Sequence, residues 1–156
     1  MVKFGLDNRA HYTTFLGACF SIGIFFVIHV AFRFLQHKIM LIIGIILCII
    51  SLVFAIIFVN SPMLAWVSVV PLMLGIAMMY NVLLVFISNA VSESEQGNAL
   101  GSVTSLKALG WLLSGALVGA IYPHITLILL GMLLILFIAF LSSLYVKEPK
   151  TRKIVV

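Results

Sequence analysis

Residues 92–110 read SESEQGNALGSVTSLKALG and form the only strongly polar interval between two long apolar stretches. No Asp, Glu, Lys or Arg occurs from residue 39 to residue 92, and none occurs from residue 108 to residue 146. A stretch without charge that is longer than about 20 residues is typical of segments that cross the hydrocarbon core of a bilayer. Residues 92–110 are therefore predicted to join two closely approaching membrane helices at one face of the bilayer.

The composition of the whole chain predicts the same solvent. Apolar residues make up 64% of the 156 residues, charged residues make up 8%, and the mean hydropathy is +1.32. Soluble domains usually contain about 45–50% apolar and about 25% charged residues. We therefore predict an all-α integral membrane protein with five transmembrane helices. These spans cover residues 13–35, 39–59, 63–90, 100–121 and 125–146, and short joints place all of them in one domain over residues 1–156.

The distribution of Lys and Arg predicts the orientation in the cell's inner or plasma membrane. Lys3 and Arg9 precede the first span, whereas Arg33, Lys38, Lys107 and the basic tail at 147–153 fall on the opposite side. The positive-inside rule then places the carboxyl terminus in the cytoplasm and the amino terminus outside. The net charge of +5 comes mostly from single, scattered residues, which does not favour nucleic acid as a partner.

Enzyme and cofactor signatures are missing from the sequence. Cys19 and Cys48 both fall inside apolar spans, where cysteine behaves as a small hydrophobic residue. No metal-ligand spacing, Walker lysine loop or nucleophile elbow is found. We therefore expect a protein that is not an enzyme and that binds neither a cofactor nor a metal ion.

The five spans differ in the polarity of their side chains. The second and fifth are almost purely aliphatic and are predicted to face lipid around most of their circumference. The first, third and fourth carry polar or small residues, so they are predicted to face protein or a cavity. The third span is predicted to tilt, or to bend near Pro71, where a backbone hydrogen bond is lost.

Two pairs of glycines at four-residue spacing mark the fourth span and the joint before it. Gly97 with Gly101, and Gly115 with Gly119, each form a Gly-x-x-x-Gly motif that lets helix backbones approach. One interpretation is ordinary tight packing of helices. The other is a sliding face that serves a conformational change between two sides of the membrane.

Polar side chains inside the spans are candidates for a cavity, and each also has a structural interpretation. Lys107 could extend its ammonium group to the membrane interface, pair with Glu93 or Glu95, or contact a substrate or proton. The methionines at 73, 78 and 79 could form an adaptable apolar wall or simply fill the core. The candidate cavity-lining residues are His29, Tyr80, Asn81, Trp111 and Ser114. The structural alternative for each is a hydrogen bond or a packing contact with a neighbouring helix.

The joint resembles a motif of the major facilitator superfamily. An acidic stretch followed by Gln96-Gly97 and by Gly101, with Thr104, Ser105 and Gly110 after it, is similar to the link between that family's tenth and eleventh helices. The closest resemblance is to drug:proton antiporters, including tetracycline efflux proteins. Pro71 and Gly75 fit the tenth helix, whereas Gly110-Trp111 departs from the family's Gly-Pro.

The resemblance implies that the five spans correspond to helices eight to twelve, a partial carboxyl-terminal half of the fold. The chain is then expected to be a truncated drug or metabolite efflux transporter, an antiporter fragment that is not active alone. The spans contain no Asp or Glu, so a carboxylate for proton coupling would lie in other helices. The alternative is a small membrane scaffold or half-transporter that assembles with a separate amino-terminal half or with itself. The small-molecule substrate is not indicated by the sequence.

Overall fold

The computed structural model describes residues 5–58, 61–121 and 124–146, and this part of the chain is helical apart from short joints. Helix α1 (Gly5–Phe26) continues through a π-helical turn, η2 (Val27–Ala31), into the short α2 (Phe32–Phe34). The remaining helices are α3 (His37–Ile57), α4 (Pro62–Ala90), α5 (Gln96–Ile121) and α6 (Ile125–Tyr145). Their apolar side chains explain helices here, because an intrahelical hydrogen bond is the way a single segment satisfies its backbone in lipid.

The prediction of an all-α membrane protein with five spans is confirmed. Five helices of the described residues are long and apolar enough to cross a bilayer. They cover Thr13–Phe34, His37–Ile57, Trp66–Ala90, Gln96–Ala120 and Thr126–Tyr145. The fourth span begins at Gln96 rather than at residue 100, so part of the polar joint is helical. The basic tail at 147–153 lies outside the described residues.

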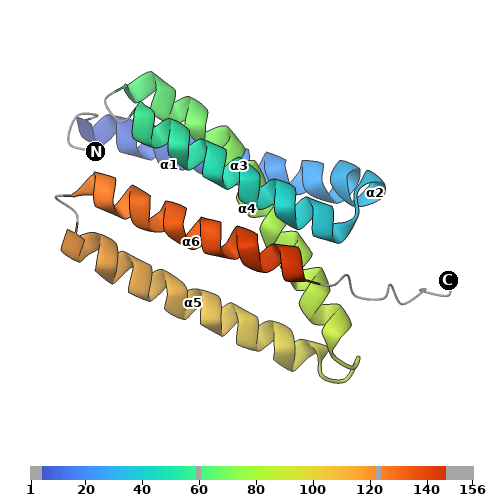
Figure 1. Ribbon diagram of the computed structural model, residues 1–156. Coiled ribbons are helices and arrows are strands. Elements are labelled where there is room, and N and C mark those ends of the chain that lie inside the picture. The colour runs from blue at the N-terminus through green and yellow to red at the C-terminus, as the bar shows by residue number, and fades with distance from the viewer. Residues whose placement is uncertain (1–4, 59–60, 122–123, 147–156) are drawn as a thin grey trace.

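The helices form a bundle from which one member stands apart. Figure 1 shows α1, α3 and α4 close together, with α6 running along α3. Helix α5 follows α4 through the joint and runs on the far side of α6 from this bundle. The spanning segment of α5 has no buried residue, whereas more than a third of the corresponding segment of α3 is buried. The bundle therefore has a packed side and an open side.

The prediction that the second span faces lipid around most of its circumference is wrong. Helix α3 packs between α4 and α6 and supplies much of the core. The prediction failed because aliphatic side chains pack against other helices as readily as against lipid. The buried core consists of Val27, Ala31, Met40, Leu41, Ile45, Ala77, Met78 and Val82.

A stripe of small residues brings α3 and α4 together. A Cβ atom built at Gly75 would lie 2.5 Å from the Gly44 carbonyl oxygen, and one at Gly44 would lie 2.9 Å from the Gly75 carbonyl oxygen. Ser51 lies on the same face of α3 and donates a hydrogen bond to the Ser68 carbonyl oxygen at 2.5 Å. This carbonyl belongs to the turn before Pro71, where the proline ring weakens the helical ladder. The backbones of α3 and α4 are therefore in close contact at this crossing.

A lysine links the ends of two other helices. Lys38, in the first turn of α3, donates a hydrogen bond of 2.9 Å to the Leu144 carbonyl oxygen in the last turn of α6. The last carbonyls of a helix have no intrahelical donor, and a cation there also complements the helix dipole. This contact fixes the amino-terminal end of α3 beside the carboxyl-terminal end of α6, at the end of the bundle where α2 lies in Figure 1.

Candidate functional site

The polar joint between α4 and α5 is organised by Ser92 and Glu95. The Ser92 hydroxyl donates to Glu95 Oε2 at 2.6 Å, and the Ser92 backbone N–H approaches the same oxygen at 3.4 Å. These hydrogen bonds, the side-chain bond first, lower the pKa of the Glu95 carboxyl group below its usual value. A lowered pKa in the folded state means that the contribution is present at neutral pH and is lost as the pH falls through that pKa. Glu93 is exposed at the same joint.

Gln96 connects the two helices across the joint. Its side-chain amide donates a hydrogen bond of 3.2 Å to the Ser88 carbonyl oxygen, which belongs to the last turn of α4. The first residue of α5 thus satisfies a carbonyl that has no donor within its own helix. This contact ties the first turn of α5 to the last turn of α4.

Replacing Gln96 with alanine is expected to lower the free energy of unfolding by about 1 kcal/mol, the usual net value of such a hydrogen bond. Asn98 is the matched control, because it is exposed on the same first turn of α5 and its side chain makes no hydrogen bond to the described residues. Denaturant titration in mixed micelles would measure both variants. Equal effects of Gln96→Ala and Asn98→Ala would contradict the role given to Gln96.

Three predicted site residues meet in the space between α4 and α5. The ammonium nitrogen of Lys107 lies 4.6 Å from the ring centroid of Tyr80 and 5.9 Å from that of Trp111. Lys107 and Trp111 share one face of α5 at four-residue spacing, and Tyr80 reaches them from α4. We call Tyr80, Lys107 and Trp111 the lysine–aromatic cluster. Its geometry is that of a cation held over aromatic faces.

The lysine–aromatic cluster lies deep in the spans. Lys107 is eleven residues from the start of α5 and Tyr80 is ten residues from the end of α4, so both lie about 16 Å along their helices from the joint. Glu95 is about 18 Å from Lys107 along the chain direction, so the predicted pairing of Lys107 with Glu93 or Glu95 is not found. Lys107 is the twelfth of the 26 residues of α5 and therefore lies near the middle of this helix.

The other cavity candidates hydrogen-bond within their own helices. The Asn81 amide donates to the Ala77 carbonyl oxygen at 2.8 Å, and the Ser114 hydroxyl donates to the Trp111 carbonyl oxygen at 3.0 Å. His29 is exposed on η2, with Nδ1 3.1 Å from the Phe25 carbonyl oxygen and its ring stacked on that of Phe25. The structure does not bring these three residues into the lysine–aromatic cluster. Their part in a cavity stays a prediction.

The four glycines predicted to pack helices have no close neighbours within the described residues. A Cβ atom at Gly97, Gly101, Gly115 or Gly119 would meet nothing within 4 Å. Close packing at these positions therefore does not occur within the described part of this chain. A contact with helices beyond it stays a prediction.

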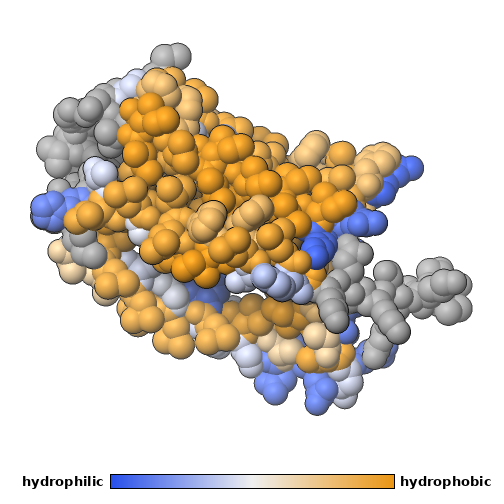
Figure 2. All heavy atoms as spheres, viewed as in Figure 1, coloured by the Kyte–Doolittle hydropathy of each residue, from blue (hydrophilic) through white to orange (hydrophobic). Residues whose placement is uncertain are grey.

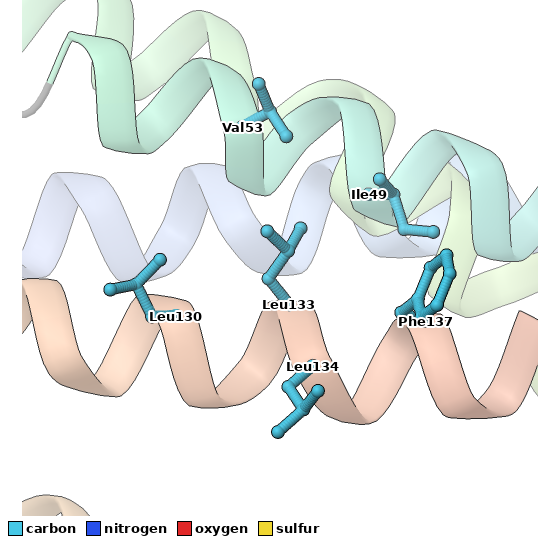
Figure 3. A pocket seen from close by; sticks show the side chains of 6 residues that line it. All are labelled: Ile49, Val53, Leu130, Leu133, Leu134 and Phe137. Carbon is cyan, nitrogen blue, oxygen red and sulfur yellow. The ribbon is translucent and has the colours of Figure 1, made fainter.

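Two further features of the bundle are apolar. Met78 is buried in the core, and Met79 lies against Gly44 at the α3–α4 crossing, so these methionines fill the core. A groove of about 390 Å³ between α3 and α6 is lined by aliphatic and aromatic side chains (Figure 3). Because no polar group lines the groove, nothing in it could orient a polar substrate. The lining residues are Ile49, Val53, Leu130, Leu133, Leu134 and Phe137.

These features define a polytopic membrane protein with one open helix and a polar cluster near the middle of that helix. The sequence profile of the Major Facilitator Superfamily matches residues 3–155. The chain therefore belongs to the major facilitator superfamily, a family of membrane transporters, and the resemblance seen at the α4–α5 joint is confirmed at the level of the family. Neither the comparison with curated proteins nor the comparison with solved structures found a match.

Proposed function

We propose that this chain supplies helices eight to twelve of a drug or metabolite efflux transporter. The observation that carries the proposal is the open position of α5, which exposes the lysine–aromatic cluster at mid-depth instead of burying it. In this family two bundles rock against each other around a site near the bilayer midplane. A helix with a polar cluster at that depth and no covering neighbour fits one wall of such a pathway.

The joint between α4 and α5 supports efflux as the direction of transport and supports the proposed orientation. The Gln96-Gly97 and Gly101 pattern after acidic residues resembles the corresponding segment of drug:proton antiporters. The orientation proposed with it has the joint, Lys38 and the carboxyl terminus in the cytoplasm and the amino terminus outside. Figure 1 supports the grouping, because the α2–α3 turn and the carboxyl-terminal end of α6 lie at the same end of the bundle as the joint.

Five helices alone are expected not to transport. The faces of α5 that carry Gly115, Gly119 and Trp111 are exposed, so the described helices would supply only one wall of a transport pathway. The missing wall would come from further helices of the same or a separate polypeptide, or from a second copy of the chain. The small residues on α5 would allow a partner helix to approach closely.

Efflux of ethidium, tetracycline and an aromatic carboxylate from proteoliposomes tests this proposal. The chain alone is expected to be inactive, and a fusion behind helices one to seven of a family efflux protein is expected to transport. Helices one to seven alone are the control. Transport by the five helices alone would contradict the need for partner helices, and an inactive but membrane-inserted fusion would contradict the efflux function.

The alternative role, a scaffold or half-transporter that assembles, is favoured by the same exposed α5. The mass of the detergent-solubilised protein distinguishes the arrangements. A dimer would indicate assembly of the chain with itself, and a copurified membrane protein would indicate a separate half. A monomer in a native membrane extract would argue against assembly.

A further inference from the structure

In the part of the chain that the structure describes, the ammonium group of Lys107 has no acidic partner. The sequence places no Asp or Glu in any of the five spans. Within the part of the chain that the structure describes, no carboxylate lies within ion-pair distance of Lys107. A lysine at the centre of a membrane helix costs about 2.5–3.5 kcal/mol on insertion scales. The insertion cost of Lys107 is therefore not offset by an ion pair with a described residue.

The two aromatic rings offset only part of this cost. Attraction between an ammonium group and an aromatic ring ranges from about 0.5–1 kcal/mol when exposed to about 2 kcal/mol when desolvated. The rings also leave the ammonium group chemically incomplete, because they accept none of its three hydrogen bonds in the usual geometry. An anion placed beside Lys107 would supply both the missing charge and a hydrogen-bond acceptor.

The lysine–aromatic cluster is also accessible to a ligand. Trp111 is 74% exposed, and Lys107 is exposed beside it, so other side chains cover neither the indole ring nor the ammonium group. Figure 2 shows that the separation between α5 and α6 remains open when all heavy atoms are drawn, with hydrophilic residues visible inside it. An apolar or aromatic body could therefore lie on Trp111 while a charged group contacts Lys107.

We propose that Tyr80, Lys107 and Trp111 form a binding site for an organic anion that joins a carboxylate to an apolar or aromatic group. Lys107 pairs with the carboxylate, and the rings of Tyr80 and Trp111 contact the apolar body. The binding site itself does not depend on the proposed transport function. Only the further step, that this anion is a transported substrate, rests on that proposal. The groups that face Lys107 come from α4 and α5, and none of them is acidic within the described residues.

The sequence offers a direct optical probe of this site. The chain has two tryptophans, Trp66 and Trp111, and a Trp66→Phe variant leaves Trp111 as the only tryptophan. Trp66 packs against Phe15, with ring centroids 5.1 Å apart, so phenylalanine preserves an aromatic contact there. Tryptophan fluorescence of this variant in nanodiscs then reports on the lysine–aromatic cluster.

Three probes of the same size separate charge from hydrophobic partitioning: 3-phenylpropionate, 3-phenylpropionamide and 3-phenylpropylamine. We expect 3-phenylpropionate to change the Trp111 fluorescence saturably and to bind at least tenfold more tightly than the other two. Lys107→Met is expected to weaken binding of the carboxylate at least tenfold, and Lys107→Arg to retain it within about threefold. Because Lys107 is exposed, neither variant opens a cavity in the core, and Lys107→Arg keeps a cation beside the rings of Tyr80 and Trp111.

Equal binding of the amide or the amine, no saturable change with the carboxylate, or no effect of Lys107→Met would overturn the inference. The cluster lies wholly within this chain, so the binding experiment needs no other helices. If the efflux fusion transports while Trp111 responds to no carboxylate, the anion site is wrong and the transport proposal stands. If 3-phenylpropionate binds with the expected Lys107 dependence while the fusion is inactive, the anion site stands and the transport proposal fails.

Discussion

Replacing Gly75 with alanine is expected to destabilise the bundle by about 2 kcal/mol, and replacing it with leucine by about 3 kcal/mol. The new Cβ atom would lie 2.5 Å from the Gly44 carbonyl oxygen and 2.7 Å from Cys48 Sγ. Because the first of these is a backbone atom, no rotation of a side chain relieves the clash. Helices α3 and α4 would have to separate at the contact that holds the core together.

Gly131→Ala is the matched control for this prediction. Gly131 lies in α6, and a Cβ atom there would meet nothing within 4 Å. Since alanine favours a helix by up to about 1 kcal/mol over glycine, this variant is expected to be neutral or slightly stabilising. Unfolding of both variants by SDS in mixed micelles would measure the difference. If Gly75→Ala and Gly131→Ala unfold alike, α3 and α4 do not cross at Gly44 and Gly75.

The class of the protein and the positions of its spans could be predicted from the sequence because the signal is long and uniform. A stretch without charge from residue 39 to residue 92 cannot remain in water, and Pro62 begins a new helix within it. The boundary at Gln96 was placed four residues late because Gly97 and Asn98 lower local hydropathy without preventing a helix. The spacing of Ser92 and Glu95, a known helix-start pattern, could have corrected it.

It was harder to predict from the sequence which spans pack against one another. Hydropathy cannot separate a helix surrounded by lipid from one surrounded by other apolar helices, since both environments favour the same side chains. The burial of α3 was therefore missed. A signal existed in the small residues Gly44, Cys48 and Ser51, which recur on one face of that helix. The glycine pairs of α5 were more conspicuous, yet they meet nothing within the described residues.

The candidate site was predicted in part. Tyr80, Lys107 and Trp111 were each singled out because polar and amphipathic side chains are rare and costly in a span. That they meet could not be predicted, because it depends on α4 and α5 leaving the joint at matching depths. Lys107 was placed about two turns into its span from a late start at residue 100, whereas α5 begins at Gln96 and the true depth is about three turns. That extra turn places Lys107 near the middle of α5 rather than near its first turns.

The depth of Lys107 leads to an expected gain on its removal. Lys107→Met is expected to improve membrane insertion of the α5 segment by about 3 kcal/mol, the cost of a lysine at the centre of a helix on insertion scales. The measurement is the inserted fraction of the Gln96–Ile121 segment in a translocon reporter protein. Lys38→Met in the His37–Ile57 segment is the control, because a lysine at a helix end reaches the interface and should change insertion by less than about 1 kcal/mol.

If Lys107→Met improves insertion and abolishes carboxylate binding, Lys107 serves binding although it makes membrane insertion of α5 less favourable. Proteins commonly carry such residues at functional sites, where an arrangement that is costly for the fold serves binding or catalysis. If Lys107→Met changes insertion as little as Lys38→Met does, the ammonium group already reaches the interface. The two aromatic rings would then anchor the lysine stem, and the lysine–aromatic cluster would lie closer to the membrane surface than the helix lengths indicate.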